Sequence, residues 1–314
     1  MSETAVLFPG QGSQVVGMGR DVAESSARAR SVFHRANEIL DFDLAALCFE
    51  GPAEELEKTD IQQPAIFVTS VALWEAFLEA GGRRELFART GGLSLGEYTA
   101  LYVAGAIDFE KCLRLVRHRG QLMQEAAVAV PGGMVTLVGA DEAVAREVCD
   151  RARQADVLAP ANFNCPGQIV ISGSLSACKR ALDIASEVGC RAVQLPVAGA
   201  FHSPIMNSAA EGLWPTLEAT DFQPPEIPVV ANVNAEYHGT PAMIRKSLKN
   251  QIVRPVLWQK CMANMVGAGI ERFVEIGPGR VLTGLMRRID RKKMAINMST
   301  AESVASGLGS LSVA

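Results

Sequence analysis

The sequence lacks long apolar runs and an excess of basic charge. No stretch of about 18 consecutive apolar residues is present, so we expect no membrane-spanning helix and no membrane partner. A predicted strand begins almost at the first residue, so we also expect no secretory signal. The formal net charge of −4 argues against nucleic acid as a principal partner. Together these absences predict a cytoplasmic protein.

Cysteine pairs are missing as well. The seven cysteines are an odd number and include no C-x-x-C pair, so neither a disulfide framework nor a metal site is predicted. Scattered reduced thiols are typical of a cytoplasmic protein. We also expect no cofactor. At 314 residues, of which 48% are hydrophobic and 20% charged, the chain can bury a large core in one compact unit or two.

A serine between two glycines is the most informative feature that is present. In Gly92-Leu93-Ser94-Leu95-Gly96 the glycines lack Cβ atoms where a strand would turn sharply into a helix, so the serine hydroxyl can project as a nucleophile. The positive N-terminal end of that helix would favour negative charge developing beside Ser94. The motif is short, and a surface turn is the alternative interpretation.

A serine nucleophile needs a base, and histidine is the side chain best suited to this near neutral pH. The chain has four histidines. His34 and His118 lie in charged helical segments, and His238 lies in a predicted turn. His202 follows an apolar run and precedes Ser203-Pro204, which predicts a helix start. Chemistry in α/β folds is placed at such strand ends. We therefore expect His202 to be the base, with a hydrogen-bonded structural histidine as the alternative.

An oxyanion hole needs two donors, and one is expected from the backbone N–H of Leu95, the residue after the serine. A second could come from the glycine-rich loop in which Gly10 and Gly12 flank Gln11. These glycines resemble the start of a dinucleotide fingerprint, but Val15 stands in place of the third glycine and no Walker lysine follows. The loop is expected to approach another loop or a ligand closely rather than to hold phosphate.

Several motifs, taken in order, resemble malonyl-CoA:acyl carrier protein transacylases. The resemblance runs from Leu7 to about Leu285 and rests on Phe8 to Gln14, Gly92 to Leu101, Arg119-Gly120, Asn162 to Gln168, Ala200 to His202, Gln251 with Pro255-Val256, and Glu275 to Gly279. Several motifs at compatible spacing are more specific than any one of them. The resemblance implies transfer of a malonyl group from malonyl-CoA to the pantetheine thiol of acyl carrier protein, which supplies fatty acid synthesis.

The resemblance also implies roles for individual residues. Ser94 is similar to the nucleophile that becomes the malonyl ester, and His202 is similar to its general base. The main-chain carbonyl of Gln251 would orient the histidine in place of the usual acid, since a neutral acceptor can fix the tautomer. Gln11 and Leu95 would supply the two backbone oxyanion donors.

Three further positions bear on the substrate. Arg119 resembles the residue that binds the malonyl carboxylate through two parallel hydrogen bonds, whereas without the resemblance it would be interpreted as a solvated charge on a helix. Phe201 is similar to the phenylalanine of malonyl-selective relatives, whose ring would exclude the extra methyl of methylmalonyl; core packing is the alternative. Leu93 departs from the family, because many members have histidine before the nucleophile.

Alternating helical and apolar segments predict an α/β fold. We expect a large α/β-hydrolase-like domain with a parallel sheet, formed by residues 1–130 and 199–314, and an inserted ferredoxin-like small domain formed by residues 131–198. The order predicted for the insert is β-α-β-β-α-β. Its strands are expected at 134–138, 157–163, 168–172 and 191–197, and its helices at 141–153 and 175–188. The clearest strands of the large domain are 5–8, 228–232 and 272–276.

Other interpretations stay open at this point. The basic cluster, which consists of Arg287, Arg288, Arg291, Lys292 and Lys293, is either solvated charge at a helix end or a docking surface for an acidic carrier protein. A serine thioesterase or esterase shares the serine motif, and a discrete polyketide-pathway acyltransferase shares the chemistry. An inactive docking module is disfavoured because Ser94, His202 and Arg119 are all present. We expect a monomer with malonyl-CoA and acyl carrier protein as partners.

Overall fold

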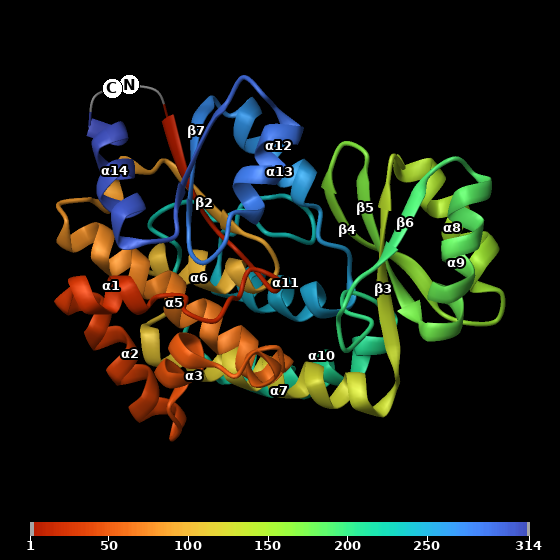
Figure 1. The fold of residues 1–314 in the computed structure, drawn as a ribbon, viewed down its shortest axis with the longest axis horizontal. Coiled ribbons are helices and arrows are strands. Elements are labelled where there is room, and N and C mark those ends of the chain that lie inside the picture. The colour runs from red at the N-terminus through yellow and green to blue at the C-terminus, as the bar shows by residue number, and fades with distance from the viewer. Residues whose placement is uncertain (1–2, 313–314) are drawn as a thin grey trace.

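The computed structural model describes residues 3–312 and contains two four-stranded sheets, each packed against helices (Figure 1). The first sheet has the order β2-β1-β7-β8, and all of its strands run parallel. Its strands are β1 (Glu3–Phe8), β2 (Arg89–Gly92), β7 (Ile270–Ile276) and β8 (Met294–Met298). Strand β1 is therefore an interior strand, with β2 on one side and β7 on the other.

The helices of the large body pack against this parallel sheet and against one another. They are α1 (Arg20–Ser25), α2 (Ala27–Leu40), α3 (Leu44–Glu50), α4 (Ala53–Leu56), α5 (Thr59–Glu79), α6 (Leu95–Val103), α7 (Phe109–Ala129), α10 (Asn207–Ala219), α11 (Pro241–Val253), α12 (Trp258–Gly267), α13 (Val281–Ile289) and α14 (Ala301–Ser312). Two short 3-10 turns, Arg84–Leu86 and Pro204–Met206, complete the set.

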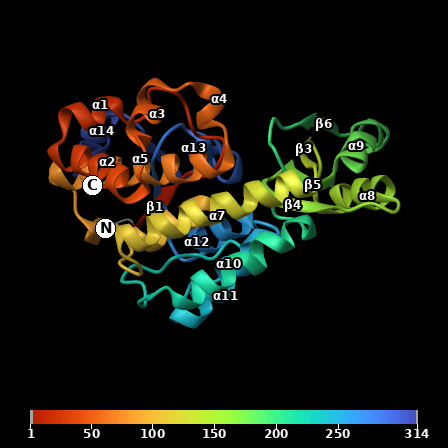
Figure 2. The same cartoon turned by 90° about the horizontal axis from the view of Figure 1, so that it is seen from below.

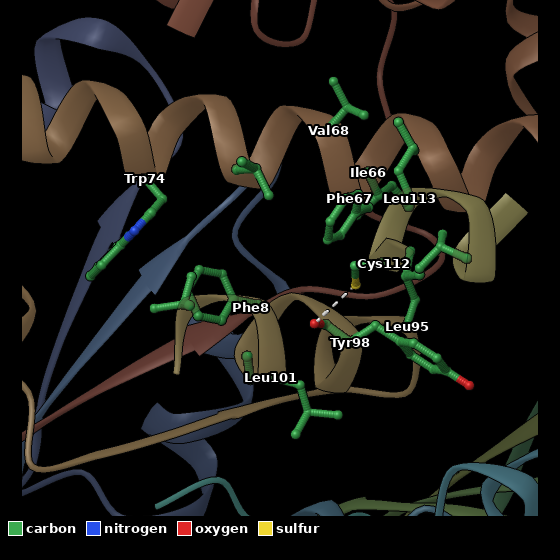
Figure 3. Close-up of a cluster of buried hydrophobic side chains, with 14 of the residues drawn as sticks. Phe8, Ile66, Phe67, Val68, Trp74, Leu95, Tyr98, Leu101, Cys112 and Leu113 are labelled. Atoms are coloured by element: carbon green, nitrogen blue, oxygen red, sulfur yellow. Dashed lines mark hydrogen bonds between the residues drawn. The ribbon is translucent and has the colours of Figure 1, made fainter. Parts of the chain in front are cut away.

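Helix α5 forms the centre of the large core. It is apolar around its whole circumference and buried over most of its length, as expected for a helix that is enclosed on every side. Phe8 of β1 meets Trp74 of α5 edge to face, with ring centroids 6.4 Å apart. Figure 3 shows this core, in which Phe67 of α5 and Tyr98 of α6 also take part. The core fixes α6, and therefore the turn that precedes it, against β1 and α5.

The second sheet confirms the predicted β-α-β-β-α-β order. It consists of β3 (Gly132–Val138), β4 (Leu158–Cys165), β5 (Gln168–Ser174) and β6 (Arg191–Gln194), arranged β4-β5-β3-β6 with every neighbouring pair antiparallel. Helices α8 (Glu142–Arg153) and α9 (Leu175–Glu187) pack together on one face of it (Figure 1). This topology is the ferredoxin-like arrangement, and all its elements fall within residues 131–198.

The side chains of β3 alternate between two environments. Val135 and Leu137 face the core that the sheet shares with α8 and α9, whereas Met134 and Thr136 face a cavity on the other side. Seen from below, α7 extends from the large body toward β3 (Figure 2). The second sheet therefore presents one face to the large body, and this face forms a wall of the cavity.

Two predicted strands differ from the structure. Residues 228–232 do not form a strand: Val229 makes an isolated parallel bridge with Thr90, and the chain turns at Asn232, whose side chain bonds into a neighbouring loop. The strand predicted at 191–197 ends at Gln194, because Pro196 has no N–H with which to continue a ladder.

All seven cysteines are buried free thiols, and burial raises the pKa of each. Within residues 3–312 no helix is both long and apolar enough to cross a bilayer. The same residues contain no cluster of three histidine, cysteine, aspartate or glutamate side chains that could hold a metal ion.

Candidate active site

Ser94 lies in a buried turn between β2 and α6 and is only 7% exposed, so the interpretation as a surface turn is wrong. Its φ of 53° and ψ of −104° are a conformation that side-chain-bearing residues rarely adopt. The flanking glycines make the turn possible. A Cβ on Gly92 would lie 2.0 Å from the Gly96 backbone, and a Cβ on Gly96 would lie 2.0 Å from the Phe8 carbonyl oxygen.

The structure brings His202 to Ser94 across 108 positions of sequence: the Ser94 Oγ and His202 Nε2 atoms are 2.9 Å apart. The other ring nitrogen, Nδ1, donates to the main-chain oxygen of Gln251 at 2.6 Å. Because a carbonyl oxygen can only accept, the proton resides on Nδ1, and Nε2 presents its lone pair to the serine hydroxyl. This is the tautomer that a general base requires.

The environment of His202 also keeps the imidazole neutral. Burial, together with the positive charge of Arg119, lowers its pKa from 6.5 to about 4, and the hydrogen bond to Gln251 opposes this only in part. At neutral pH the ring can therefore accept a proton from Ser94.

This pKa predicts the pH dependence of acylation. With acetyl-CoA as donor, kcat/KM should stay level as the pH falls through 6.5 and decline only toward about 4, because protonated His202 cannot accept the serine proton. In Arg119→Ala the decline should begin at higher pH, since the charge that disfavours the imidazolium is gone. Stopped-flow acylation at each pH, with circular dichroism to check the fold, measures both profiles; identical profiles centred at 6.5 would contradict the assignment.

Arg119 on α7 is 1% exposed, so the interpretation as a solvated surface charge is wrong. Its Nη2 donates to Ser94 Oγ at 3.0 Å and to Gln251 Oε1 at 2.9 Å, and its Nη1 donates to Gln63 Oε1 at 2.5 Å. The guanidinium also lies 5.3 Å from the centre of the Tyr98 ring. Within residues 3–312 no carboxylate lies within ion-pair distance of Arg119, and its Nε has no hydrogen-bond partner.

Close helix packing accounts for the burial of this charge. A Cβ on Gly120 would lie 2.9 Å from the Thr59 carbonyl oxygen, so glycine lets α7 approach the start of α5. That contact brings Gln63 of α5 beside Arg119. Burial lowers the pKa of Arg119, but a guanidinium remains protonated in proteins. A buried cation without an acidic partner is costly, so the site is suited to an anionic ligand.

The glycine-rich loop after β1 approaches the serine turn, as expected. A Cβ on Gly10 would lie 2.2 Å from the Leu93 carbonyl oxygen, so only glycine fits there. Gln11 lines the same cavity as Ser94, and Leu95 is the first residue of α6. In the part of the chain that the structure describes, the backbone N–H groups of Gln11 and Leu95 donate to no protein acceptor. Within residues 3–312 both N–H groups are therefore unpaired at the serine turn, although only Gln11 lines the cavity and Leu95 is fully buried.

A cavity of about 270 Å³ contains Ser94 and His202 and is walled by both parts of the molecule. The second sheet contributes Met134, Thr136 and Val170, and Phe201 and Leu285 contribute apolar surface from the large body. Most of the lining is apolar, with a few polar groups beside the serine, as in many small-molecule sites. Phe201, predicted to set acyl selectivity, thus lies at the cavity and not only in the core.

Sequence reasoning missed Asn232, Gln63, Glu97 and His238. Asn232 Oδ1 accepts from the backbone N–H of Ser94 at 2.6 Å, and its Nδ2 donates to the Gly92 carbonyl at 2.9 Å, so one amide clamps both sides of the turn. A signal for Gln63 was present, because Gln62 and Gln63 form a glutamine pair in a largely apolar helix, and such polar side chains are seldom buried. Nothing local marks the other three.

The geometry agrees with comparisons to known proteins. The family model described as "Acyl transferase domain" matches residues 6–306. The chain belongs to the acyl transferase family.

Relatives within this family carry a narrower name. The chain is 41% identical over 306 residues to the malonyl CoA-acyl carrier protein transacylase of Bacillus subtilis (strain 168), with 97% of this chain and 96% of that protein covered. The solved malonyl CoA-acyl carrier protein transacylase of Coxiella burnetii superposes with a TM-score of 0.95 at 37% identity, covering 99% of this chain and 98% of that one. These similarities confirm the resemblance that the motifs indicated, and with it the α/β fold class.

One solved acyl transferase complex bears on partners. It is a type II PKS acyl-carrier protein in complex with its malonyl-transacylase, with a TM-score of 0.94, 40% identity, and coverage of 98% of this chain and 100% of that one.

Proposed function

We propose that the protein transfers a malonyl group from malonyl-CoA to the pantetheine thiol of acyl carrier protein through a malonyl ester on Ser94, and so supplies fatty acid synthesis. One observation carries the substrate class: the buried Arg119 guanidinium, which has no carboxylate partner in residues 3–312, lies 3.0 Å from the serine oxygen. A guanidinium at this place suits an acyl group that ends in a carboxylate.

In the first half-reaction Ser94 Oγ attacks the thioester carbonyl carbon of malonyl-CoA while its proton passes to His202 Nε2. The backbone N–H groups of Gln11 and Leu95 donate to the oxyanion. When the tetrahedral intermediate collapses, the carbon–sulfur bond breaks and the CoA sulfur leaves with the proton from His202. The products are the malonyl ester and free CoA.

The second half-reaction follows the same path in reverse. The pantetheine thiol gives its proton to His202 as its sulfur attacks the ester carbonyl, and the carbon–oxygen bond then breaks. Ser94 Oγ recovers the proton, which restores the free site. The main-chain carbonyl of Gln251 holds the ring throughout and stabilises the transient imidazolium.

The proposal is tested by weighing the intact protein after incubation with malonyl-CoA, acetyl-CoA or methylmalonyl-CoA. We expect one malonyl adduct per chain, and we expect holo acyl carrier protein to remove it and gain the same mass. A thioesterase or esterase would release malonate to water with no gain by the carrier protein.

A polyketide pathway is the second candidate, because a similar protein has been solved with a type II PKS carrier protein. Transfer rates to carrier proteins of the two pathways, measured side by side with the same malonylated protein, distinguish these alternatives.

Phe201 is proposed to exclude the methyl group of methylmalonyl. In Phe201→Ser the preference for malonyl-CoA over methylmalonyl-CoA should fall by about tenfold or more, because a cavity opens where the ring stood. Competition between the two donors, followed by intact mass, measures the ratio within one sample, so a general loss of stability does not affect it. An unchanged ratio would show that the ring serves packing alone.

A further inference from the structure

Glu97 is a buried carboxylate that the mechanism above does not use. It follows Ser94 by three positions on α6 and is 0% exposed. Its Oε1 accepts from His238 Nε2 at 2.8 Å. Its Oε2 accepts from the backbone N–H of Asn232 at 3.0 Å and from Gln251 Nε2 at 2.7 Å. Removal of a charge from water costs stability, and these three donors offset that cost and fix the carboxylate beside the serine turn.

The Gln251 amide connects this carboxylate to the substrate arginine. Its Nε2 donates to Glu97 and also to the Ser94 carbonyl oxygen at 3.0 Å, which uses both amide hydrogens. Its Oε1 is thereby left facing Arg119 Nη2 at 2.9 Å. In the reversed orientation the NH2 group would meet the guanidinium donors, and the amide oxygen would meet two other oxygens. The negative charge of Glu97 therefore selects the orientation in which Gln251 accepts from Arg119.

We propose that Glu97 is a positioning residue for acyl selectivity, which acts through the Gln251 side chain to hold the Arg119 guanidinium where a malonyl carboxylate binds. The inference rests on the proposed function, because it assigns a further determinant of the same site. Gln63 accepts from one Nη of the guanidinium and Gln251 from the other, so an amide released from Glu97 leaves Nη2 with its contact to Ser94 Oγ alone. Burial lowers the pKa of Arg119, and the negative charge of Glu97 is one of the smaller effects that oppose this shift.

The histidine is held by a separate contact of Gln251. His202 bonds to the Gln251 main-chain oxygen, whereas Glu97 and Arg119 bond to the Gln251 side chain. A change at Glu97 should therefore alter carboxylate binding much more than proton transfer. The ratio of malonyl to acetyl transfer therefore tests the proposal, because a residue with a merely structural role would leave that ratio unchanged.

The test replaces Glu97 with glutamine, which keeps the shape and removes the charge. We expect kcat/KM for malonyl-CoA to fall by about ten- to a hundredfold, mostly through KM, since a charge-assisted hydrogen bond is lost. Acetyl-CoA has no carboxylate, so its kcat/KM should change little. Equal losses for the two donors, or no loss for either, would overturn the proposal.

A second variant, Gln251→Met, tests the same path independently, in case Glu97→Gln does not fold. It removes both ends of the amide while leaving the main-chain oxygen that holds His202, and it should reproduce the loss of malonyl preference. In the Arg119→Ala background, Glu97→Gln should cause no further loss of malonyl transfer; additive losses in this double-mutant cycle would contradict a path through Arg119.

Glu275 offers a matched control. It is a second buried carboxylate with several hydrogen bonds, but these go to the start of α13, at Leu282 and Thr283. Glu275→Gln should lower thermal stability without changing the malonyl-to-acetyl ratio. If the unmodified protein transfers no malonyl group, the proposed function fails. If it does and Glu97→Gln keeps the same ratio, only this inference fails.

Discussion

The Ser94→Ala protein is expected to gain no malonyl mass at any concentration of malonyl-CoA, and its transfer rate should fall by about a millionfold, as when other serine enzymes lose their nucleophile. The reason is chemical: the ester oxygen of the intermediate is the serine oxygen itself. His202 would remain in place, because its bond to the Gln251 main-chain oxygen does not involve Ser94. Intact mass spectrometry and a carrier-protein transfer assay measure the two effects.

Ser172→Ala is the matched control for this experiment. Ser172 is a buried serine on β5, and within residues 3–312 its hydroxyl has no hydrogen-bond partner, so its removal should leave malonylation unchanged. A Ser94→Ala protein that still takes up a malonyl group would rule out Ser94 as the nucleophile.

Arg119→Ala is expected to lower kcat/KM for malonyl-CoA by roughly thirtyfold to several thousandfold, because a buried partner of the substrate carboxylate is removed. Transfer of acetyl groups should be spared or improved, since acetyl has no carboxylate and the pKa of His202 rises once the neighbouring charge is gone. Kinetics measured in parallel with malonyl-CoA and acetyl-CoA give the ratio of the two kcat/KM values, which tests the carboxylate role of Arg119.

The neighbouring Arg117→Ala variant provides the comparison. Arg117 lies on the same helix but pairs with Asp60 and lies 5.2 Å from the centre of the Phe42 ring, away from the cavity. Its removal should leave the malonyl-to-acetyl ratio unchanged. If Arg119→Ala lowers transfer of both acyl groups equally, the carboxylate role is wrong and the arginine serves the serine alone.

Local patterns were enough to predict the serine turn and the second sheet. The glycines around Ser94 are required because a Cβ at either position would lie 2.0 Å from backbone atoms, and the short G-x-S-x-G spacing shows this constraint in the sequence. The ferredoxin-like order followed from the alternation of strand and helix periods. The choice of His202 depended on the character of the segment around it, and the structure places its Nε2 at the serine oxygen.

The network beneath the serine could not be predicted, because its contacts join distant positions. Asn232 and His238 reach Glu97 across 135 and 141 residues, and a turn histidine beside a tyrosine carries no sign of such a partner. Residues 228–232 were wrongly predicted as a strand, because a short apolar run alone resembles one. The run does not show that Asn232, at its end, bonds to the backbone of the Ser94 turn. The burial of Arg119 likewise depends on helix packing that charge patterns do not reveal.

The buried thiols have a bearing on how acyl groups are handled. A thioester exchanges readily with thiolates, so an ionised cysteine beside the donor would compete with Ser94 for the acyl group. All seven sulfur atoms keep their protons because burial disfavours the anion, and among the described residues lining the cavity none is a cysteine. Among the described residues that line the cavity, the hydroxyl of Ser94 therefore meets the donor without a competing thiolate beside it.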